Sequence, residues 1–332
     1  MSAADTVETA LALSTQQVLF AGHAIEIRTN SPQVARCAQQ YFNPIQHVES
    51  NPTASRASIT IHVRDTDELC DNAPFFRARG HFALARFTRG DSFWLNLRTR
   101  EIVGECSAEL ADDSRRWRAH IFPALLGILS AAIDVAPVHA ACLVREGRGI
   151  LLAGHSGAGK STLTIAMARR GYALLADDWT YLSATEDSGA RADVQAWGLP
   201  VPVKLLPDAD AFFGELLAFR TDCSLNGEIA YEVWPEECFG ISRSLRSAVS
   251  SVVLLERASK QGCSMIPIAR GKAVAHLQAE IEPLEGTLAE CYKRQLDLIQ
   301  HAVEGAPCYR FSFNDHPDRV AETLDRALAS VS

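Results

Sequence analysis

Hydrophobic and polar positions alternate in the first third of the chain, which is the pattern of half-buried β-strands. The strand-like stretches are 18–29, 58–63, 82–87 and 93–97. Ser31 followed by Pro32 is typical of a helix N-terminus, so we predict a helix that ends near Phe42. Strands combined with one short helix predict a small α+β domain over residues 1–112.

A different pattern covers residues 113–135, which are rich in Arg at first and then in Leu, Ile and Ala. This composition predicts a helix that connects two units. Its apolar part, 121–133, has about 13 residues, whereas a helix that spans a bilayer needs about 20. We therefore expect a buried core helix and no membrane partner.

Short continuous apolar runs replace the alternating pattern from residue 136 onward, as in strands that are buried on both faces. These runs are 138–144, 150–153, 172–176, 229–234, 251–255, 264–268 and 309–313. Helical patterns cover 286–304 and 317–329. Apolar strands and helices in this mixture indicate an α/β fold for a second domain, 136–332.

Composition narrows the class of protein. The 332 residues include 32 Lys and Arg against 40 Asp and Glu, so the formal net charge is −8. An acidic chain repels phosphate backbones, which excludes a broad nucleic-acid surface. Nine scattered cysteines include no C-x-x-C pair, and the first residues lack a basic n-region. We therefore expect a reduced cytoplasmic protein without a nucleic-acid partner.

Residues 154–161 match the phosphate-binding pattern G-x-x-x-x-G-K-[ST] in full, between a predicted strand and a predicted helix. Its glycines free backbone N–H groups to cradle anionic oxygens, Lys160 can reach the β- and γ-phosphates, and Ser161 can ligate Mg²⁺. The predicted nucleotide-binding residues are Gly154, His155, Ser156, Gly157, Ala158, Gly159, Lys160, Ser161 and Thr162. We expect ATP and Mg²⁺ as cofactors; ATP is the default nucleotide, because no N-K-x-D motif for guanine is present.

Two adjacent carboxylates, Asp177 and Asp178, follow the predicted strand 172–176. A P-loop enzyme uses one carboxylate at such a position for Mg²⁺, and a second can accept the proton of an attacking hydroxyl. His139 lies on the predicted strand that precedes the phosphate loop. A packed core histidine and a residue beside the phosphates are equally consistent with that position.

Three segments in this order resemble the HPr kinase/phosphorylase-like family of bacterial P-loop kinases. They are V-H-A at 138–140, G-H-S-G-A-G-K-S-T at 154–162 and R-R-G-Y-A-L-L-A-D-D at 169–178. The resemblance implies a P-loop kinase core of the HPr kinase/phosphoenolpyruvate carboxykinase type and phosphoryl transfer to a serine-type hydroxyl. By position, Lys160 and Ser161 would hold phosphates and Mg²⁺. Asp177 would be the base, Asp178 the metal ligand, with the reverse assignment open, and His139 would lie near the transferred phosphate.

The chain also departs from that family. The signature E-x-R-G-x-G is missing, and the segment 236–240 does not match it. HPr is therefore not the expected substrate. The chain looks more like remote kinases encoded with ribosomally made peptides, such as those that phosphorylate the C-terminal serine of lasso-peptide precursors. The N-terminal domain would then present a peptide or protein substrate, and a homo-oligomer stays open because the family often forms oligomers.

Basic residues downstream are further candidates for the site. Lys204 and Arg243 could stabilise the charge of a phosphoryl-transfer transition state, whereas Arg246 fits a solvated basic stretch better.

Three functions fit these motifs. The first is an ATP- and Mg²⁺-dependent kinase of a serine-type hydroxyl in a peptide or protein. The second is a small-molecule kinase that uses the same residues. The third is a nucleotide-gated sensor without transfer, which has less need of a paired carboxylate than an enzyme has.

Overall fold

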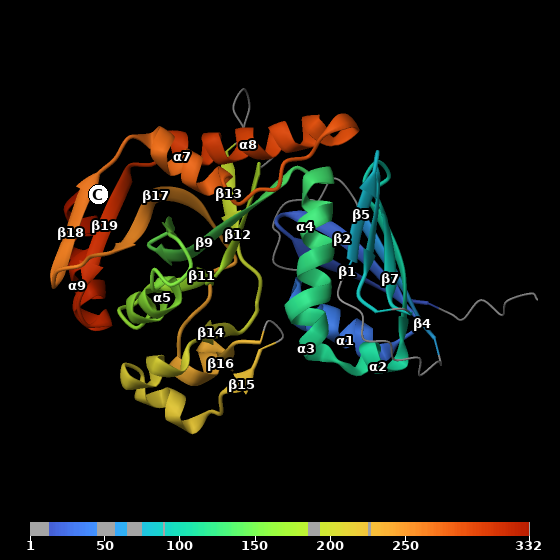
Figure 1. The fold of residues 1–332 in the computed structure, drawn as a ribbon, viewed down its shortest axis with the longest axis horizontal. Helices are drawn as coiled ribbons and strands as arrows, with labels where there is room; N and C mark the ends of the chain where they lie inside the picture. Colours follow the sequence, from blue (N-terminus) through green and yellow to red (C-terminus); the bar gives the residue numbers. More distant parts are fainter. Residues whose placement is uncertain are drawn as a thin grey trace, which may run out of the picture.

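The computed structural model describes residues 13–44, 57–64, 75–88, 90–184, 193–224 and 227–331. In this part the chain is a mixed α/β protein with three sheets (Figure 1). An eight-stranded N-terminal sheet is formed before residue 108, and a second, central sheet and a three-stranded small sheet are formed after residue 134. The change of sheet falls near the predicted boundaries, although the division into domains stays a prediction.

The N-terminal sheet has the strand order β3-β1-β2-β4-β8-β7-β6-β5. Its strands are β1 (Ser14–Phe20), β2 (His23–Thr29), β3 (Asn43–Pro44), β4 (Ala57–Arg64), β5 (Phe75–Arg79), β6 (Phe82–Arg86), β7 (Ser92–Asn96) and β8 (Glu101–Ser107). The prediction of one strand over 18–29 was wrong. The chain forms a β1–β2 hairpin there, because Ala21 and Gly22 both adopt positive φ, at 48° and 84°, and reverse its direction.

The predicted helix after Ser31 is confirmed as α1 (Pro32–Tyr41). The Ser31 side chain accepts a hydrogen bond from the backbone N–H of Val34, and Pro32 occupies the first turn, where its missing N–H costs nothing. The apolar positions Val34, Ala38 and Tyr41 recur at helical spacing and are buried. This face fixes α1 against the N-terminal sheet.

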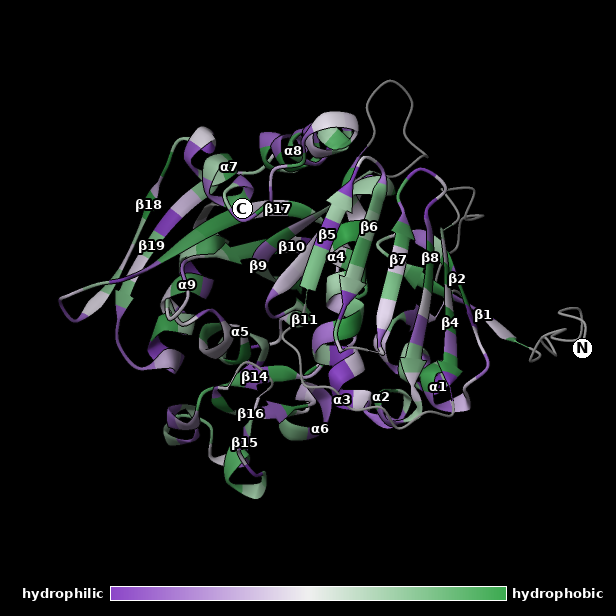
Figure 2. Cartoon of the chain, turned by 45° about the vertical axis from the view of Figure 1, so that its right-hand side comes forward, coloured by the Kyte–Doolittle hydropathy of each residue, from purple (hydrophilic) through white to green (hydrophobic). Residues whose placement is uncertain are grey.

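The predicted connecting helix is divided into several pieces. After α2 (Ala108–Asp112) come α3 (Ser114–Arg116), a π-helical turn (Trp117–Ile121) and α4 (Phe122–Ala132). The expectation of a buried apolar helix is confirmed, since α4 is apolar on most sides and lies between the N-terminal sheet and the rest of the chain (Figures 1 and 2). Within the described residues, no helix combines the length and the apolar character needed to cross a membrane.

The central sheet has the order β10-β9-β12-β13-β17-β19-β18, with β11 also on β9 and a further pairing between β10 and β17 that closes a ring. Its strands are β9 (Val135–Arg145), β10 (Arg148–Ala153), β11 (Ala173–Ala176), β12 (Trp179–Ala184), β13 (Val194–Trp197), β17 (Arg246–Arg257), β18 (Gly262–Pro267) and β19 (Cys308–Asn314). Successive residues of β10 face opposite sides, as the period of two requires. Ile150 and Leu152 belong to one hydrophobic cluster, whereas Leu151 and Ala153 belong to another.

Helices cover both sides of the central sheet. The first cluster contains residues of α5 (Lys160–Ala168) and α9 (Pro317–Val331), and the second contains residues of α7 (Arg270–Gln278) and α8 (Ala289–Glu304). The small sheet projects below α5 (Figure 1) and consists of β14 (Val203–Leu205), β16 (Ile229–Val233) and β15 (Asp222–Cys223). Two 3-10 helices, Pro207–Ala211 and Gly214–Ala218, and α6 (Pro235–Phe239) accompany it. A further 3-10 turn, Gly286–Leu288, precedes α8, so the predicted helix over 286–304 begins irregularly.

The N-terminal part and the remainder share one hydrophobic core. Tyr181, Trp197 and Leu199 belong to the same buried cluster as the N-terminal sheet and α4. Polar contacts reinforce this junction, because the Asn43 side chain donates to the Gly198 carbonyl at 2.8 Å and Ser183 donates to the Ala21 carbonyl at 2.8 Å. The relative position of the two parts is therefore fixed by packing as well as by the connecting helices.

Candidate functional site

The glycine loop, residues 154–159, lies between β10 and α5, as the motif predicts. Gly157 and Gly159 adopt φ values of 77° and 91°, which residues with a Cβ atom avoid. The Lys160 side chain folds back over the loop, and its Nζ donates to the Gly154 carbonyl at 2.8 Å. Burial lowers the pKa of Lys160, and the charges of Asp178 and Asp177 oppose this shift.

Strand pairing brings the two sequence motifs to one edge of the central sheet. β10 and β11 both pair antiparallel to β9, on opposite sides of it, so they run parallel to each other without being neighbours. Their carboxyl ends, and the glycine loop and Asp177 that follow them, therefore lie at the same edge. Ala153 pairs with Ala140 of β9, which places His139 one residue further along at this edge.

Asp177 is directed at the start of α5. Its carboxylate accepts hydrogen bonds from the Ser161 hydroxyl and from the backbone N–H of Lys204, while its buried Oδ1 atom has no hydrogen-bond partner among the described residues. Burial, followed by the charge of Asp178, raises the pKa of Asp177 to about 7, although these hydrogen bonds and Lys160 act in the opposite direction.

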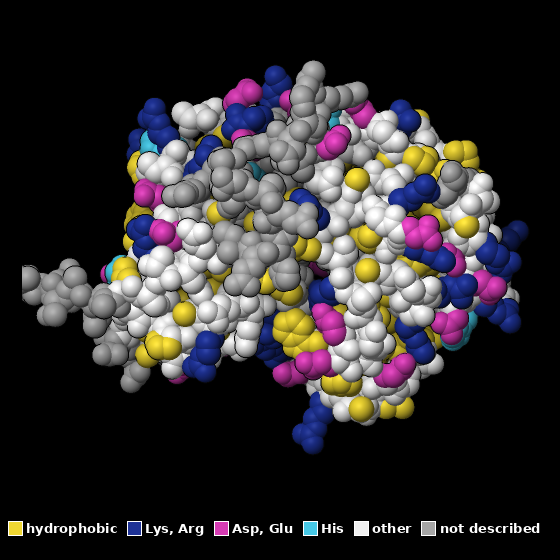
Figure 3. Space-filling model, turned by 180° about the vertical axis from the view of Figure 1, so that it is seen from behind, with side chains coloured by type: hydrophobic (Ala, Val, Ile, Leu, Met, Phe, Trp, Pro, Cys, Tyr) yellow, Lys and Arg dark blue, Asp and Glu magenta, His cyan; other side chains and the backbone are white. Residues whose placement is uncertain are grey.

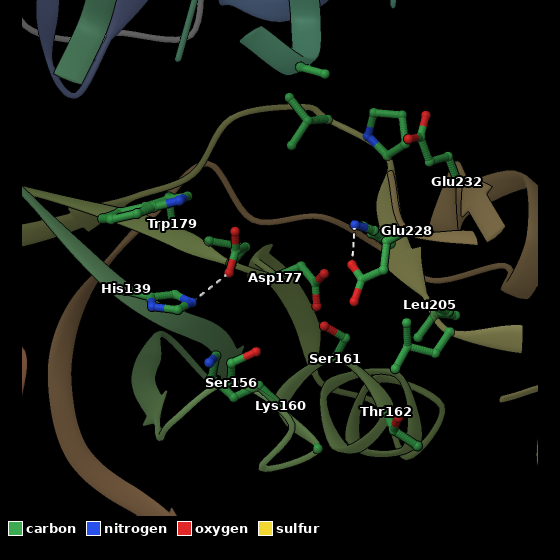
Figure 4. A pocket seen from close by; sticks show the side chains of 18 of the residues that line it. His139, Ser156, Lys160, Ser161, Thr162, Asp177, Trp179, Leu205, Glu228 and Glu232 are labelled. Atoms are coloured by element: carbon green, nitrogen blue, oxygen red, sulfur yellow. Dashed lines mark hydrogen bonds and ion pairs between the residues drawn. The ribbon is translucent and has the colours of Figure 1, made fainter. Parts of the chain in front are cut away.

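Asp178 has a different environment from its neighbour. Its Oδ1 lies 2.9 Å from Nε2 of His139, and its side chain is 60% exposed. Trp179 pairs with His139 across β12 and β9, and the two rings stack with centroids 5.3 Å apart (Figure 4). His139 is thus a cleft residue held by a ring and a carboxylate, rather than a packed core histidine. The two adjacent carboxylates face different partners.

The oxygen atoms near Ser161 suit a magnesium ion. Mg²⁺ prefers hard oxygen ligands and is commonly held by one or two protein oxygens together with substrate phosphates. The Ser161 hydroxyl and the buried Oδ1 of Asp177 supply such oxygens beside the glycine loop. Among the described residues no group of three or more His, Cys, Asp or Glu side chains is arranged to hold a metal by itself. Ser161 and Asp177 are therefore the residues of the cleft that could hold such an ion.

These residues line a cleft of about 600 Å³. The face seen from behind is hollowed at its lower edge, between the lobe with the small sheet and the N-terminal part, and acidic, basic and apolar side chains are interspersed there (Figure 3). Three parts of the fold contribute to the lining: the edge of the central sheet, the small sheet and the N-terminal part. The polar and aromatic side chains of the lining include Tyr41, Arg118, His139, Lys160, Ser161, Asp177, Asp178, Trp179, Tyr181, Lys204, Glu228, Glu232 and Arg257.

The predicted nucleotide-binding residues lie together, with one exception. Residues 155–162 all line the cleft, whereas Gly154 is not part of the lining. A Cβ atom at Gly154 would approach the Leu255 carbonyl to 2.9 Å, so this glycine is required by packing of the loop against β17. The sequence motif alone does not separate this packing role from contact with a ligand.

The two predicted basic residues have different positions. Lys204 lines the cleft, and its Nζ lies 2.6 Å from Oε2 of Glu228. Arg243 is not among the lining residues. Its guanidinium pairs with Glu236 and donates to the carbonyls of Leu199 and Val201, so it holds the segment that precedes β14.

Arg257 is a cleft residue that sequence reasoning missed. It ends β17, which runs parallel to β10, and its Nη2 atom would lie 2.8 Å from a Cβ atom at Gly159. Its guanidinium lies over the Phe313 ring at 4.9 Å. The available signal was its place two residues after the predicted strand 251–255, since parallel strands that run side by side end at the same edge of a sheet. Tyr41 and Arg118 come from distant segments and had no such signal.

Comparisons with known proteins give little beyond this geometry. No family model matches the chain, and no curated protein matches it. Among solved structures, the HPr(Ser) kinase/phosphatase from Coxiella burnetii matches with 17% identity and a TM-score of 0.30, over 58% of this chain and 95% of that chain.

Proposed function

We propose that the chain is an ATP- and Mg²⁺-dependent kinase that transfers the γ-phosphoryl group to a serine-type hydroxyl of a peptide or protein. One observation carries the proposal: a glycine loop with Lys160 and Ser161 meets two adjacent carboxylates in one cleft, and each carboxylate has its own partner. Two aspartates in a purely structural turn do not need separate partners, whereas phosphoryl transfer needs one carboxylate at the metal and another as the base.

The donor half of the cleft is the edge formed by the glycine loop. Its backbone N–H groups and the N-terminus of α5 favour phosphate oxygens, and Lys160 leaves the Gly154 carbonyl to neutralise the β- and γ-phosphates. Ser161 and Asp177 would hold Mg²⁺, which when bound neutralises charge on the β- and γ-phosphate oxygens. Arg257 supplies a second cation beside Gly159.

The contacts favour Asp177 as the metal ligand and Asp178 as the base, which reverses the roles that the family resemblance implies by position. Asp177 is engaged with Ser161, so it is the metal-side oxygen. Asp178 is exposed to the cleft and paired with His139, so it is the group that an acceptor can reach. Asp178 takes the proton as the acceptor oxygen bonds to the γ-phosphorus and the bond from that phosphorus to the β-γ bridging oxygen breaks. ADP and a phosphorylated acceptor result, and His139 orients the carboxylate throughout.

A matched pair of variants tests the proposal. The purified chain is incubated with γ-labelled ATP, Mg²⁺ and pools of serine-containing peptides, and labelled peptide is measured beside binding of a fluorescent ATP analogue. Asp178→Asn should abolish labelling and leave nucleotide binding within about threefold, because only the base is lost. Lys160→Met should weaken both.

Each competing function has its own outcome in this experiment. Labelling at the wild-type rate by Asp178→Asn would refute Asp178 as the base. Tight nucleotide binding by the wild type without labelling of any pool would favour a sensor. Mass spectrometry of a peptide-free cell extract, treated in the same way, identifies a phosphorylated small molecule if the acceptor is one.

A further inference from the structure

The N-terminal part completes the cleft on the side that faces the carboxylate Asp178. Tyr41 of α1 and Arg118 of the π-helical turn both line it. The Tyr41 hydroxyl donates to the Tyr181 hydroxyl, and burial, followed by the charge of Asp178, raises the pKa of Tyr181. In the close-up, elements in the colours of the N-terminal part lie across the pocket from the helix that carries Ser161 (Figure 4). This is the acceptor half of the proposed site.

Arg118 is a cation without a carboxylate in this half. Within the described residues it has no ion pair and no side-chain hydrogen bond, and its guanidinium lies over the Trp234 ring at 5.9 Å. The neighbouring arginines differ: Arg115 pairs with Asp222 at 2.6 Å and with Glu232 at 3.2 Å, and Arg116 pairs with Asp113 at 3.7 Å. Two of the three arginines on this short segment are therefore held by carboxylates, whereas Arg118 is held, in the described part of the chain, only by an aromatic ring.

The backbone explains why Arg118 reaches the cleft. A π-helical turn inserts an extra residue into a helix, and such turns often mark functional sites. Here the turn keeps Trp117 and Ile121 fully buried, with the Trp117 indole donating to the Leu110 carbonyl at 2.8 Å. The residues between these two anchors are Arg118, Ala119 and His120, and the first two line the cleft.

The acidic side chains of the cleft do not satisfy Arg118. Glu232 accepts two hydrogen bonds from Arg115, at 3.2 Å each, and Glu228 pairs with Lys204 at 2.6 Å. Because these glutamates have their own cations, the guanidinium of Arg118 keeps its hydrogen-bonding edge for a ligand. Planar guanidinium groups prefer carboxylates, which they bind through two parallel hydrogen bonds.

We propose that Arg118 is an acceptor-recognition residue, and that the acceptor peptide presents a carboxylate next to its hydroxyl residue. This inference rests on the proposed kinase function and adds the substrate class. The carboxylate belongs either to an acidic side chain beside the serine or to the end of a peptide chain. The N-terminal part thus selects the hydroxyl that is placed beside Asp178, while residues at the edge of the central sheet carry out the phosphoryl transfer.

Peptide pools of defined charge test this proposal. Three pools with blocked ends carry serine next to Glu, Gln or Lys, and a fourth carries serine at a free carboxyl end. Each is labelled with γ-labelled ATP by the wild type, by Arg118→Gln and by Arg98→Gln, an exposed arginine outside the cleft that serves as the control. The wild type should prefer the Glu pool or the free-end pool about tenfold or more over the Gln pool, as expected for charge-assisted hydrogen bonds.

Arg118→Gln should lose this preference by raising the KM for the carboxylate pool, with the KM for ATP and the kcat nearly unchanged. Arg118→Lys should keep part of it, and Arg98→Gln all of it. A preference that survives in Arg118→Gln, or a wild type that labels all pools equally, overturns the proposal and leaves the kinase function intact. An equal loss of kcat on every pool assigns Arg118 to the transferred phosphate instead. No labelling of any pool by the wild type overturns the kinase function itself.

Discussion

Replacing Asp177 by Asn removes a carboxyl group that the fold holds at a pKa of about 7, far above its ordinary value of 3.8. A carboxyl whose pKa is raised by folding favours the folded state most at low pH, where it is neutral. Its penalty grows as the pH rises above the unfolded value, and is complete once the folded value is passed. Wild-type stability should therefore fall between about pH 4 and pH 8 through this one group.

The size of the effect follows from the two pKa values. A shift of about 3 units corresponds to about 4 kcal/mol, at 1.36 kcal/mol per unit, of which about 2.5 kcal/mol develops between pH 5 and pH 8. Asp177→Asn lacks this titration, so its free energy of unfolding relative to the wild type should increase by about 2.5 kcal/mol over that range. The variant should gain stability with pH relative to the wild type while losing transfer activity.

Urea unfolding of both proteins without nucleotide, at half-unit steps of pH, measures this difference directly. Asp178→Asn is the matched comparison, because it removes the like charge that is the second cause of the shift at Asp177. For Asp178→Asn we expect the free energy of unfolding to depend on pH less steeply than in the wild type and more steeply than in Asp177→Asn. Parallel curves for the wild type and Asp177→Asn would refute the reasoning, since they would mean that Asp177 titrates alike in the folded and unfolded chains.

Further predictions concern packing and the metal. Gly198→Ala should destabilise the protein by more than about 2 kcal/mol in thermal or urea unfolding, because a Cβ atom there would lie 1.7 Å from the Leu175 carbonyl. Gly127→Ala, on an exposed helical position with open space, should instead stabilise it by about 0.5–1 kcal/mol, and a loss of stability there would contradict the helical assignment. Ser161→Ala removes a hydrogen bond that lowers the pKa of Asp177. It also removes the hydroxyl that is proposed to ligate Mg²⁺. The variant should therefore need a higher Mg²⁺ concentration for the same thermal stabilisation by nucleotide, and an unchanged Mg²⁺ titration would exclude Ser161 as a ligand.

Local signals in the sequence predicted the elements that depend on neighbours in the chain. Ser31 and Pro32 marked the start of α1 correctly, because capping involves residues within one turn. The glycine loop was found between a strand and a helix for the same reason. The errors were also local: positive φ at Ala21, a residue without the usual preference for it, hid the β1–β2 turn, and the π-helical turn at Trp117–Ile121 was not signalled.

The sequence by itself determined the groups that short segments can offer: a glycine loop followed by Lys160 and Ser161, a pair of carboxylates and a histidine one strand earlier. Tertiary structure decided how these groups are divided. Pairing of β10 and β11 on opposite sides of β9 turned Asp177 toward Ser161 and left Asp178 to His139. It also brought Arg118 into the cleft and kept Arg243 out of it. The physical reason is that hydrogen-bonded motifs are specified over a few residues, whereas a cleft is formed by packing between segments that are far apart in the chain.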